Sequence, residues 1–217
     1  MLRMHKVPEM TISNAWQIVR LCCSEVICTA ILAFTIARSI ENPPGPAAGF
    51  LFVPVSLFLG IWIGGPVSGG HINPVVTLVL CACRWVSFIY LPIYWLSQFV
   101  GVLVGMGLAH GFTLAMLNGT EPKNLTTDGL LGDFFWIHLA AETLTTTMFL
   151  LTVVSSADSK RPGNWTGSGF YTSLSVASMA LIIGLFFDAR IACFVNPIVP
   201  VGTAIVFGIK TGFWVSL

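Results

Sequence analysis

Two asparagine–proline pairs, Asn73-Pro74 and Asn196-Pro197, carry the clearest chemical signal in this sequence. An asparagine side chain caps the start of a helix, and proline fits the first turn because the N–H that it lacks would have no partner there. Each pair therefore predicts a helix whose N-terminal end carries partial positive charge. Amide donors at two such ends suit a neutral molecule with oxygen lone pairs, whereas the positive ends repel a cation or a proton.

A glutamate inside an apolar stretch precedes each of these pairs. Glu25 lies 48 residues before Asn73, and Glu142 lies 54 residues before Asn196. Acidic side chains are costly inside a membrane and are functional there by default. On the residues alone, a proton relay is one role that the two glutamates allow.

The elements that must position these residues are apolar helices. Hydrophobic residues make up 55% of the 217-residue chain and charged residues only 9%, against about 25% charged in a typical soluble domain. Such a chain must be solvated mostly by lipid or by apolar protein, and its net charge of +1 suggests no nucleic-acid partner. A helix needs roughly 20 apolar residues to cross a bilayer. Five stretches qualify: about 16–40, 48–67, 86–110, 134–156 and 167–187.

The stretches that begin at the Asn-Pro pairs, residues 73–82 and 196–207, are apolar but too short to cross a bilayer. They predict two half-length helices. Non-helical backbone at membrane depth is tolerated only where it is buried in protein or lines a water-filled cavity. We therefore expect the half helices to enter from opposite faces and to meet at a cavity near the midplane.

The chain divides into two similar halves, each with a glutamate-bearing span and an Asn-Pro half helix. The halves are residues 16–110 and 134–217, with a loop at 111–133 between them and a polar segment at 1–15 before them. An odd number of spans in the first half places the second half on the opposite face, which predicts an inverted repeat. Such repeats with interrupted helices are typical of transport folds.

Residues 68–77, SGGHINPVVT, resemble the first signature loop of the aquaporin (major intrinsic protein) family, S-G-x-H-x-N-P-A-V-T, with Val75 in place of the alanine. The second signature is weaker, because Ile198 and Val199 stand where the family has alanine and arginine. The resemblance covers roughly residues 16–217 and implies an atypical member. It implies an all-α membrane fold, an inverted repeat of transmembrane helices with two re-entrant half helices.

The missing arginine belongs to the family's narrow selectivity filter. Carried over residue by residue, the resemblance implies that the constriction here consists of Val53, Gly184, Cys193 and Val199. The identity of the solute is therefore open, because such a ring is apolar where the family's is charged.

The resemblance also assigns roles to polar residues around the loops. It implies that Glu25 and Glu142 accept hydrogen bonds from loop backbone N–H groups, a brace that we favour over the proton relay. His71 is expected to hydrogen bond the glycine-rich loop, and Gln98 matches the family's third helix. His71 has no second histidine or cysteine at ligand spacing, so we expect no metal and no cofactor. The motifs of hydrolases are absent from the sequence, so we expect no enzyme activity.

Only about ten residues follow the second half helix, whereas the family fold has a sixth span, so that span is expected to be truncated. Basic residues predict a cytoplasmic N-terminus. Asn118 and Asn124 then lie in glycosylation sequons outside the cell, and the sequon at Asn164 lies in the cytoplasm. We expect the plasma membrane, with an intracellular membrane as the alternative, and the resemblance implies a homotetramer.

These features predict a passive channel for water or small neutral solutes such as glycerol. The alternative is a membrane structural or adhesion protein with a narrow or closed pore, because Val75, Ile198 and Val199 are bulky at the expected constriction. An active transporter lacks support, since the sequence has neither a nucleotide motif nor a pair of acids for a coupling ion.

Overall fold

The computed structural model describes residues 15–41, 46–119, 135–158, 169–186 and 194–208, and the regular elements in these segments are all helical. They are α1 (Ala15–Glu41), α2 (Pro46–Ser68), α3 (Pro74–Ala82), the short 3-10 helix η2 (Phe88–Tyr90), α4 (Leu91–Met116), α5 (Phe135–Ala157), α6 (Gly169–Phe186) and α7 (Ile198–Phe207).

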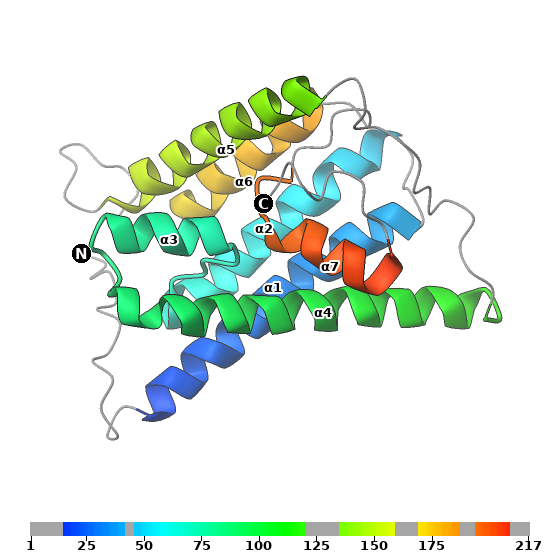
Figure 1. The fold of residues 1–217 in the computed structure, drawn as a ribbon, viewed down its shortest axis with the longest axis horizontal. Helices are drawn as coiled ribbons and strands as arrows, with labels where there is room; N and C mark the ends of the chain where they lie inside the picture. Colours follow the sequence, from blue (N-terminus) through cyan, green and yellow to red (C-terminus); the bar gives the residue numbers. More distant parts are fainter. Residues whose placement is uncertain (1–14, 42–45, 120–134, 159–168, 187–193, 209–217) are drawn as a thin grey trace.

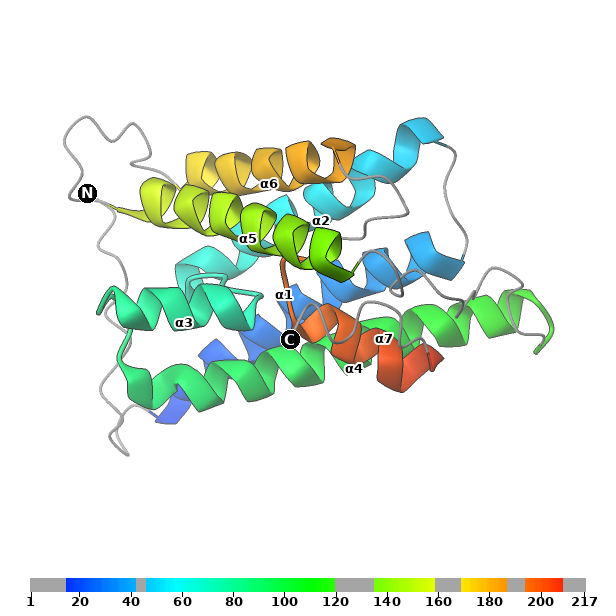
Figure 2. The same cartoon turned by 45° about the horizontal axis from the view of Figure 1, so that its top comes forward.

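The long helices form two packed groups around the two short ones. Helix α1 packs against α2 and α4, and α6 packs against α2 and α5. Figures 1 and 2 show α1 with α4 on one side, α5 with α6 on the other, and α3 and α7 between them. Helices α3 and α7 extend from the middle of the molecule towards opposite ends (Figure 1).

Four of the five predicted spans form helices long and apolar enough to cross a membrane: Ala15–Glu41, Leu51–Ser68, Phe88–Met116 and Trp136–Ala157. The fifth, predicted at 167–187, forms α6, which has 18 residues and is therefore at the short end of what a bilayer requires. Large apolar side chains remain exposed on the outer faces of these helices, among them Leu96 and Leu151 at 65% each. Such surfaces suit contact with lipid rather than water.

Glycines set the distance between α1 and α4. A Cβ atom at Gly105 would lie 2.3 Å from the carbonyl oxygen of Ala30, and one at Gly101 would lie 2.7 Å from that of Val26. No larger residue fits this crossing without moving a backbone. Helix α7 meets α4 in a similar way, since a Cβ at Gly202 would lie 2.1 Å from the Val102 side chain.

The two short apolar stretches are helices with the expected extents. Helix α3 begins at Pro74, directly after Asn73, and α7 begins at Ile198, two residues after Asn196. Several sequence predictions fall outside the described residues: the N-terminal segment before Ala15, the sequons at Asn124 and Asn164, Cys193, and the truncated sixth span after Gly208.

Candidate functional site

The first Asn-Pro pair starts α3 as a conventional helix cap. Asn73 has an extended backbone, and its Oδ1 accepts a hydrogen bond from the N–H of Val75 at 2.9 Å. Pro74 occupies the first helical turn. The amide nitrogen of Asn73 is directed elsewhere, because Nδ2 donates to the carbonyl oxygen of Val195 at 2.9 Å.

The second pair mirrors the first. Asn196 Oδ1 accepts from the N–H of Ile198 at 3.3 Å, and Asn196 Nδ2 donates to the carbonyl oxygen of Ile72 at 3.0 Å. Each asparagine therefore binds the residue that precedes the other asparagine. These reciprocal contacts join residues 122 and 124 positions apart in the sequence. They hold the N-terminal ends of α3 and α7 together in the middle of the molecule.

The two residues that receive these bonds have strained backbones. Ile72 and Val195 lie in the left-handed region, with φ of 57° and 55°. Both are β-branched, and such residues are outliers there, at a cost of about 1–3 kcal/mol each. The conformation turns each carbonyl towards the opposite asparagine, so this strain is part of the site's construction.

Buried carboxylates stabilise both strained loops. Glu25 is fully buried, and its oxygens accept from the backbone N–H groups of His71 at 3.0 Å and Ile72 at 2.9 Å. Glu142 accepts from the N–H groups of Phe194 at 2.9 Å and Val195 at 2.7 Å. These contacts have the geometry of a backbone brace. They occupy the carboxylate oxygens with loop donors, which disfavours the proton relay as their role.

Side chains around the first loop, from α2, α3 and α4 as well as the loop itself, extend this network. Glu25 also accepts from Ser68 Oγ at 2.6 Å and from Gln98 Nε2 at 2.9 Å, and that Nε2 lies 3.1 Å from Thr77 Oγ1. Nδ1 of His71 hydrogen bonds Thr77 Oγ1 at 3.1 Å. The ring of His71 therefore contacts a side chain of α3, whereas we expected it to bind the loop backbone.

Tyr94 and Thr77 have structural roles that the sequence did not reveal. Tyr94 stacks on His71 with ring centroids 4.3 Å apart, and its hydroxyl donates to the carbonyl oxygen of Ser68. Thr77 Oγ1 also donates to the carbonyl oxygen of Asn73 at 3.1 Å. The spacing of Thr77, four residues after Asn73, is a signal that could have indicated this contact.

A cavity of about 540 Å³ lies against both asparagines. Val53, Gly184 and Val199, which the resemblance assigned to the constriction, all line it. Apart from the asparagines, most of the lining is aliphatic or aromatic. An amide NH2 carries two N–H groups, so each asparagine can donate to the opposite loop and to a molecule in the cavity.

The other two altered positions of the signatures do not line this cavity. Ile198 is buried in a cluster with Ala33, Val102 and Met106, between α1 and α4. Val75 is partly buried and contributes its backbone N–H to the cap on Asn73. Of the three bulky residues expected at the constriction, only Val199 faces the cavity.

The lining includes residues that the sequence analysis missed. Leu32, Ile36 and Ser39 of α1, and Phe149 and Val153 of α5, contribute to the wall. Their spacing of three or four residues within each helix is the available signal, but it is shared with every other packed face of an apolar helix.

Two further expectations concern metals and sugars. The described residues contain no group of three or more histidine, cysteine or acidic residues that could hold a metal ion. Asn118 is exposed in the turn after α4 with a φ of 53°, a conformation that asparagine tolerates better than most residues.

Comparison with known proteins agrees with this architecture. The family model described as Major intrinsic protein matches residues 12–217. Aquaporin-5 of Sus scrofa is 29% identical over 194 residues, which cover 84% of this chain and 68% of the relative. Aquaporin NIP2-1 of Zea mays is 27% identical over 205 residues, which cover 88% of this chain and 63% of the relative. The chain thus spans about two thirds of the length of these relatives.

Among solved structures, the aquaglyceroporin from Plasmodium falciparum has the same fold, with a TM-score of 0.76 at 20% identity over 92% of this chain and 89% of the other. The family match also confirms the expectation that the chain is not an enzyme, since the family consists of channels. This chain is a multi-pass integral membrane protein and belongs to the major intrinsic protein family.

Proposed function

We propose that the chain is a passive transmembrane channel for water and small neutral solutes such as glycerol, with Asn73 and Asn196 at the midpoint of the path. The observation that carries this proposal is the reciprocal asparagine contact at the wall of an apolar cavity. Two helix N-termini converge there, and each presents an amide donor. The names of the relatives, aquaporin and aquaglyceroporin, agree with such a role.

The electrostatics of the midpoint favour a neutral solute. Each helix N-terminus is equivalent to about half a positive charge. A molecule with oxygen lone pairs accepts from the asparagine amides, whereas a cation or a proton meets two positive ends. Glu25 and Glu142 act as braces in this proposal, because their carboxylate oxygens accept hydrogen bonds from loop N–H groups.

We propose that α3 and α7 are re-entrant half helices of an inverted repeat. The two halves, residues 16–110 and 134–217, form a single channel domain in this interpretation. The support is the matched construction of the two loops: a buried glutamate, a left-handed residue and an asparagine cap in each. Irregular backbone of this kind is stable at membrane depth where protein buries it.

The constriction is proposed to consist of Val53, Gly184 and Val199, together with Cys193. Val199 supplies neither the charge nor the hydrogen bonds of an arginine, which makes the chain an atypical member of its family. Water that passes an apolar ring loses hydrogen bonds without replacement. A solute with some carbon loses less, so we expect glycerol and similar solutes to be favoured over water alone.

The alternative, a structural or adhesion protein with a closed pore, has less support. It rested on three bulky residues, and two of them, Val75 and Ile198, lie away from the cavity. Purified full-length protein in liposomes tests the choice. A channel raises the rate of glycerol-driven swelling above that of empty liposomes, whereas equal rates would favour the structural role.

The cellular setting completes the proposal. With its N-terminus in the cytoplasm, the chain would place Asn118 and Asn124 outside the cell, where both can be glycosylated. We propose a homotetramer in the plasma membrane. The exposed apolar faces of the long helices can serve both lipid and subunit contacts.

A further inference from the structure

Two hydroxyl side chains line the cavity at opposite ends. Ser39 is in the last turn of α1, and Thr172 is in the first turn of α6. Helix α1 ends on the side towards which α7 extends, and α6 begins on the side towards which α3 extends (Figure 1). The asparagines join α3 and α7 in the middle of the molecule. One hydroxyl therefore lies on each side of them.

The rest of the cavity wall offers few polar side chains. Besides the two hydroxyls and the two asparagines, His71 is the one polar side chain of the lining among the residues that the structure describes, and its Nδ1 is bonded to Thr77. A solute that enters such a cavity loses its hydrogen bonds to water, and an unpaired polar group in apolar surroundings costs free energy. A hydroxyl oxygen at either end is therefore a valuable partner for a polar solute.

Each of these hydroxyls already uses its proton in a hydrogen bond. Ser39 Oγ donates to the carbonyl oxygen of Thr35 at 2.9 Å, and Thr172 Oγ1 donates to the carbonyl oxygen of Ser156 at 3.2 Å. A hydroxyl has one proton and two lone pairs, so each oxygen is left as an acceptor for a molecule in the cavity. The asparagine amides between them are donors. The side chains therefore offer an acceptor, then donors, then an acceptor along the cavity.

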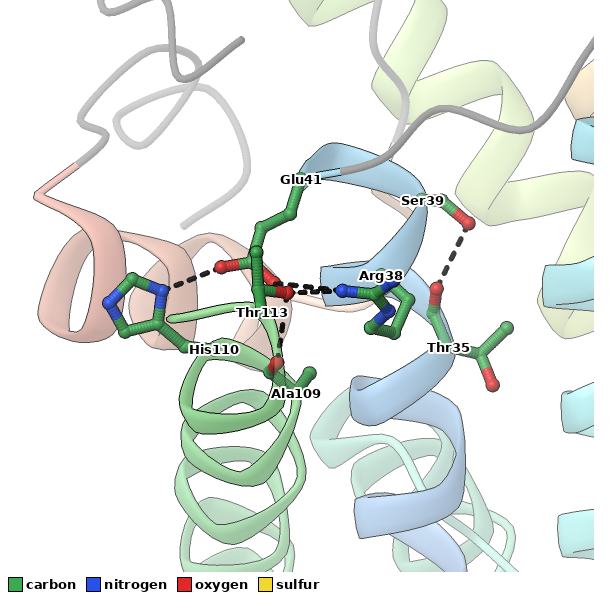
Figure 3. Close-up of polar contacts among 7 residues, drawn as sticks. All are labelled: Thr35, Arg38, Ser39, Glu41, Ala109, His110 and Thr113. Atoms are coloured by element: carbon green, nitrogen blue, oxygen red, sulfur yellow. Dashed lines mark hydrogen bonds and ion pairs between the residues drawn. The ribbon is translucent and has the colours of Figure 1, made fainter. Parts of the chain in front are cut away.

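A charged cluster at the same end of α1 is kept out of the cavity. Glu41 has a fully buried side chain, lies 2.6 Å from Nδ1 of His110 and accepts from Thr113 Oγ1 at 2.6 Å. Arg38 also donates to Thr113. Figure 3 shows the hydroxyl of Ser39 directed away from this cluster. None of the four cluster residues lines the cavity, so a neutral oxygen, not a charge, faces a solute at this end.

We propose that Ser39 and Thr172 are specificity-determining residues, each of which accepts a hydrogen bond from a solute O–H or N–H. The solutes that fit are small neutral molecules that donate as well as accept, such as a polyol or urea. Selectivity in such a pore depends on its width and on the donors and acceptors that line it. Water molecules in a file can donate to one another, whereas a solute that fills the path must find its acceptors on the wall. The inference rests on the proposed channel function.

The test measures glycerol, urea and water flux through the full chain in liposomes. Ser39→Ala and Thr172→Val remove the two acceptors with little change of shape. Loss of one neutral hydrogen bond corresponds to about a two- to ten-fold decrease, so glycerol and urea flux should fall by this factor in each variant and water flux by less. Thr172→Ser keeps the hydroxyl and should lose less glycerol flux than Thr172→Val.

Ser173→Ala and Thr152→Val are the matched controls. Both remove a hydroxyl that bonds within its own helix, to Gly169 and to Met148, and neither residue lines the cavity. They should keep the wild-type ratio of glycerol flux to water flux. Melting temperatures in detergent show which variants are folded, and either Ser39→Ala or Thr172→Val is decisive alone if the other does not fold.

The flux ratio separates a specificity role from a packing role, because Thr172 also connects α6 to α5. Equal proportional losses of all three fluxes in Ser39→Ala and Thr172→Val would overturn the inference. A wild type that conducts glycerol, with the same flux ratio in both variants, would overturn the inference and leave the channel standing. Wild-type flux no higher than that of empty liposomes for all three solutes would contradict the channel and this inference with it.

Discussion

Replacing Glu142 with glutamine would remove the negative charge and one of the two acceptor oxygens while keeping the shape of the side chain. Glu142 is buried, and each of its oxygens accepts one backbone N–H, from Phe194 and from Val195. The amide keeps a single acceptor. One of the two N–H groups therefore loses its partner, and the other exchanges a charged acceptor for a neutral one.

The loss can be estimated from these two contacts. A hydrogen bond to a charged group contributes about 1.5–3 kcal/mol, and a neutral one about 0.5–1.5 kcal/mol. Losing one charged bond and weakening the second gives a cost of about 2–4 kcal/mol. In a chain of this size, each kcal/mol lost from the free energy of unfolding lowers the melting temperature by about 2–4 °C. We therefore expect the melting temperature to decrease by about 4–16 °C.

Solute flux should fall by more than the loss of folded protein alone would cause. Val195 is held in its left-handed conformation by this carboxylate, at a strain of about 1–3 kcal/mol. With the brace weakened, Val195 can relax and its carbonyl turns away from Asn73 Nδ2, to which it lies at 2.9 Å. Solute flux should then fall even in the fraction of the protein that remains folded.

Thermal unfolding in detergent and glycerol flux in liposomes measure the two effects. Thr143→Val is the matched control, because Thr143 is the neighbouring residue on α5 but is exposed and bonds only within its own helix in the described contacts. It should leave both readouts nearly unchanged. If Glu142→Gln has the same melting temperature and the same flux as the wild type, the brace is refuted and this carboxylate has a different role.

Three further predictions address other parts of the account. Val199→Arg adds a charge and bulk to an apolar ring, so glycerol and urea flux should fall more than water flux. Paired flux measurements on the wild type and the variant check this. An equal loss of all three fluxes would contradict the position of Val199 in the constriction. Gly105→Ala places a Cβ 2.3 Å from the Ala30 carbonyl oxygen and should lower the melting temperature markedly, whereas Gly107→Ala, with open space around its Cβ, should not. A glycosidase-sensitive gel shift should disappear on mutation of Asn118 and Asn124 together but persist on mutation of Asn164, and sugar on Asn164 would reverse the orientation.

Much of the site could be predicted from the sequence because its residues are anomalous in their surroundings. Glu25 and Glu142 stand out in apolar stretches, and proline after asparagine marks the start of a helix. Such features report on local chemistry. The helical spans could also be predicted from the sequence, because length and hydropathy alone define them.

Other features depend on tertiary contacts that no local pattern contains. Ile72 and Val195 are β-branched, so nothing in their identity predicts a left-handed backbone; the Glu25 and Glu142 contacts impose it. Ile198 was expected at the constriction, but the face of α7 on which it lies is set by the close approach of Gly202 to α4.

The buried contact between Glu41 and His110 was not predicted, for a similar reason. Glu41 and His110 are 69 residues apart and lie near the ends of spans, where charged side chains ordinarily face water. Their burial becomes visible only once α1 and α4 are packed together. Polar residues at span ends therefore require the tertiary structure before they can be interpreted.

The most direct test of the central claim is a comparison of glycerol and cation flux in liposomes containing the wild type, Asn73→Asp or Asn196→Asp. An aspartate places negative charge at the paired helix ends and partly cancels the field that excludes cations. The wild type should conduct glycerol and exclude cations, and each correctly folded variant should lose glycerol flux or leak cations. Glycerol flux at the wild-type level without a cation leak in both folded variants would contradict the claim that these asparagines form the midpoint of the path.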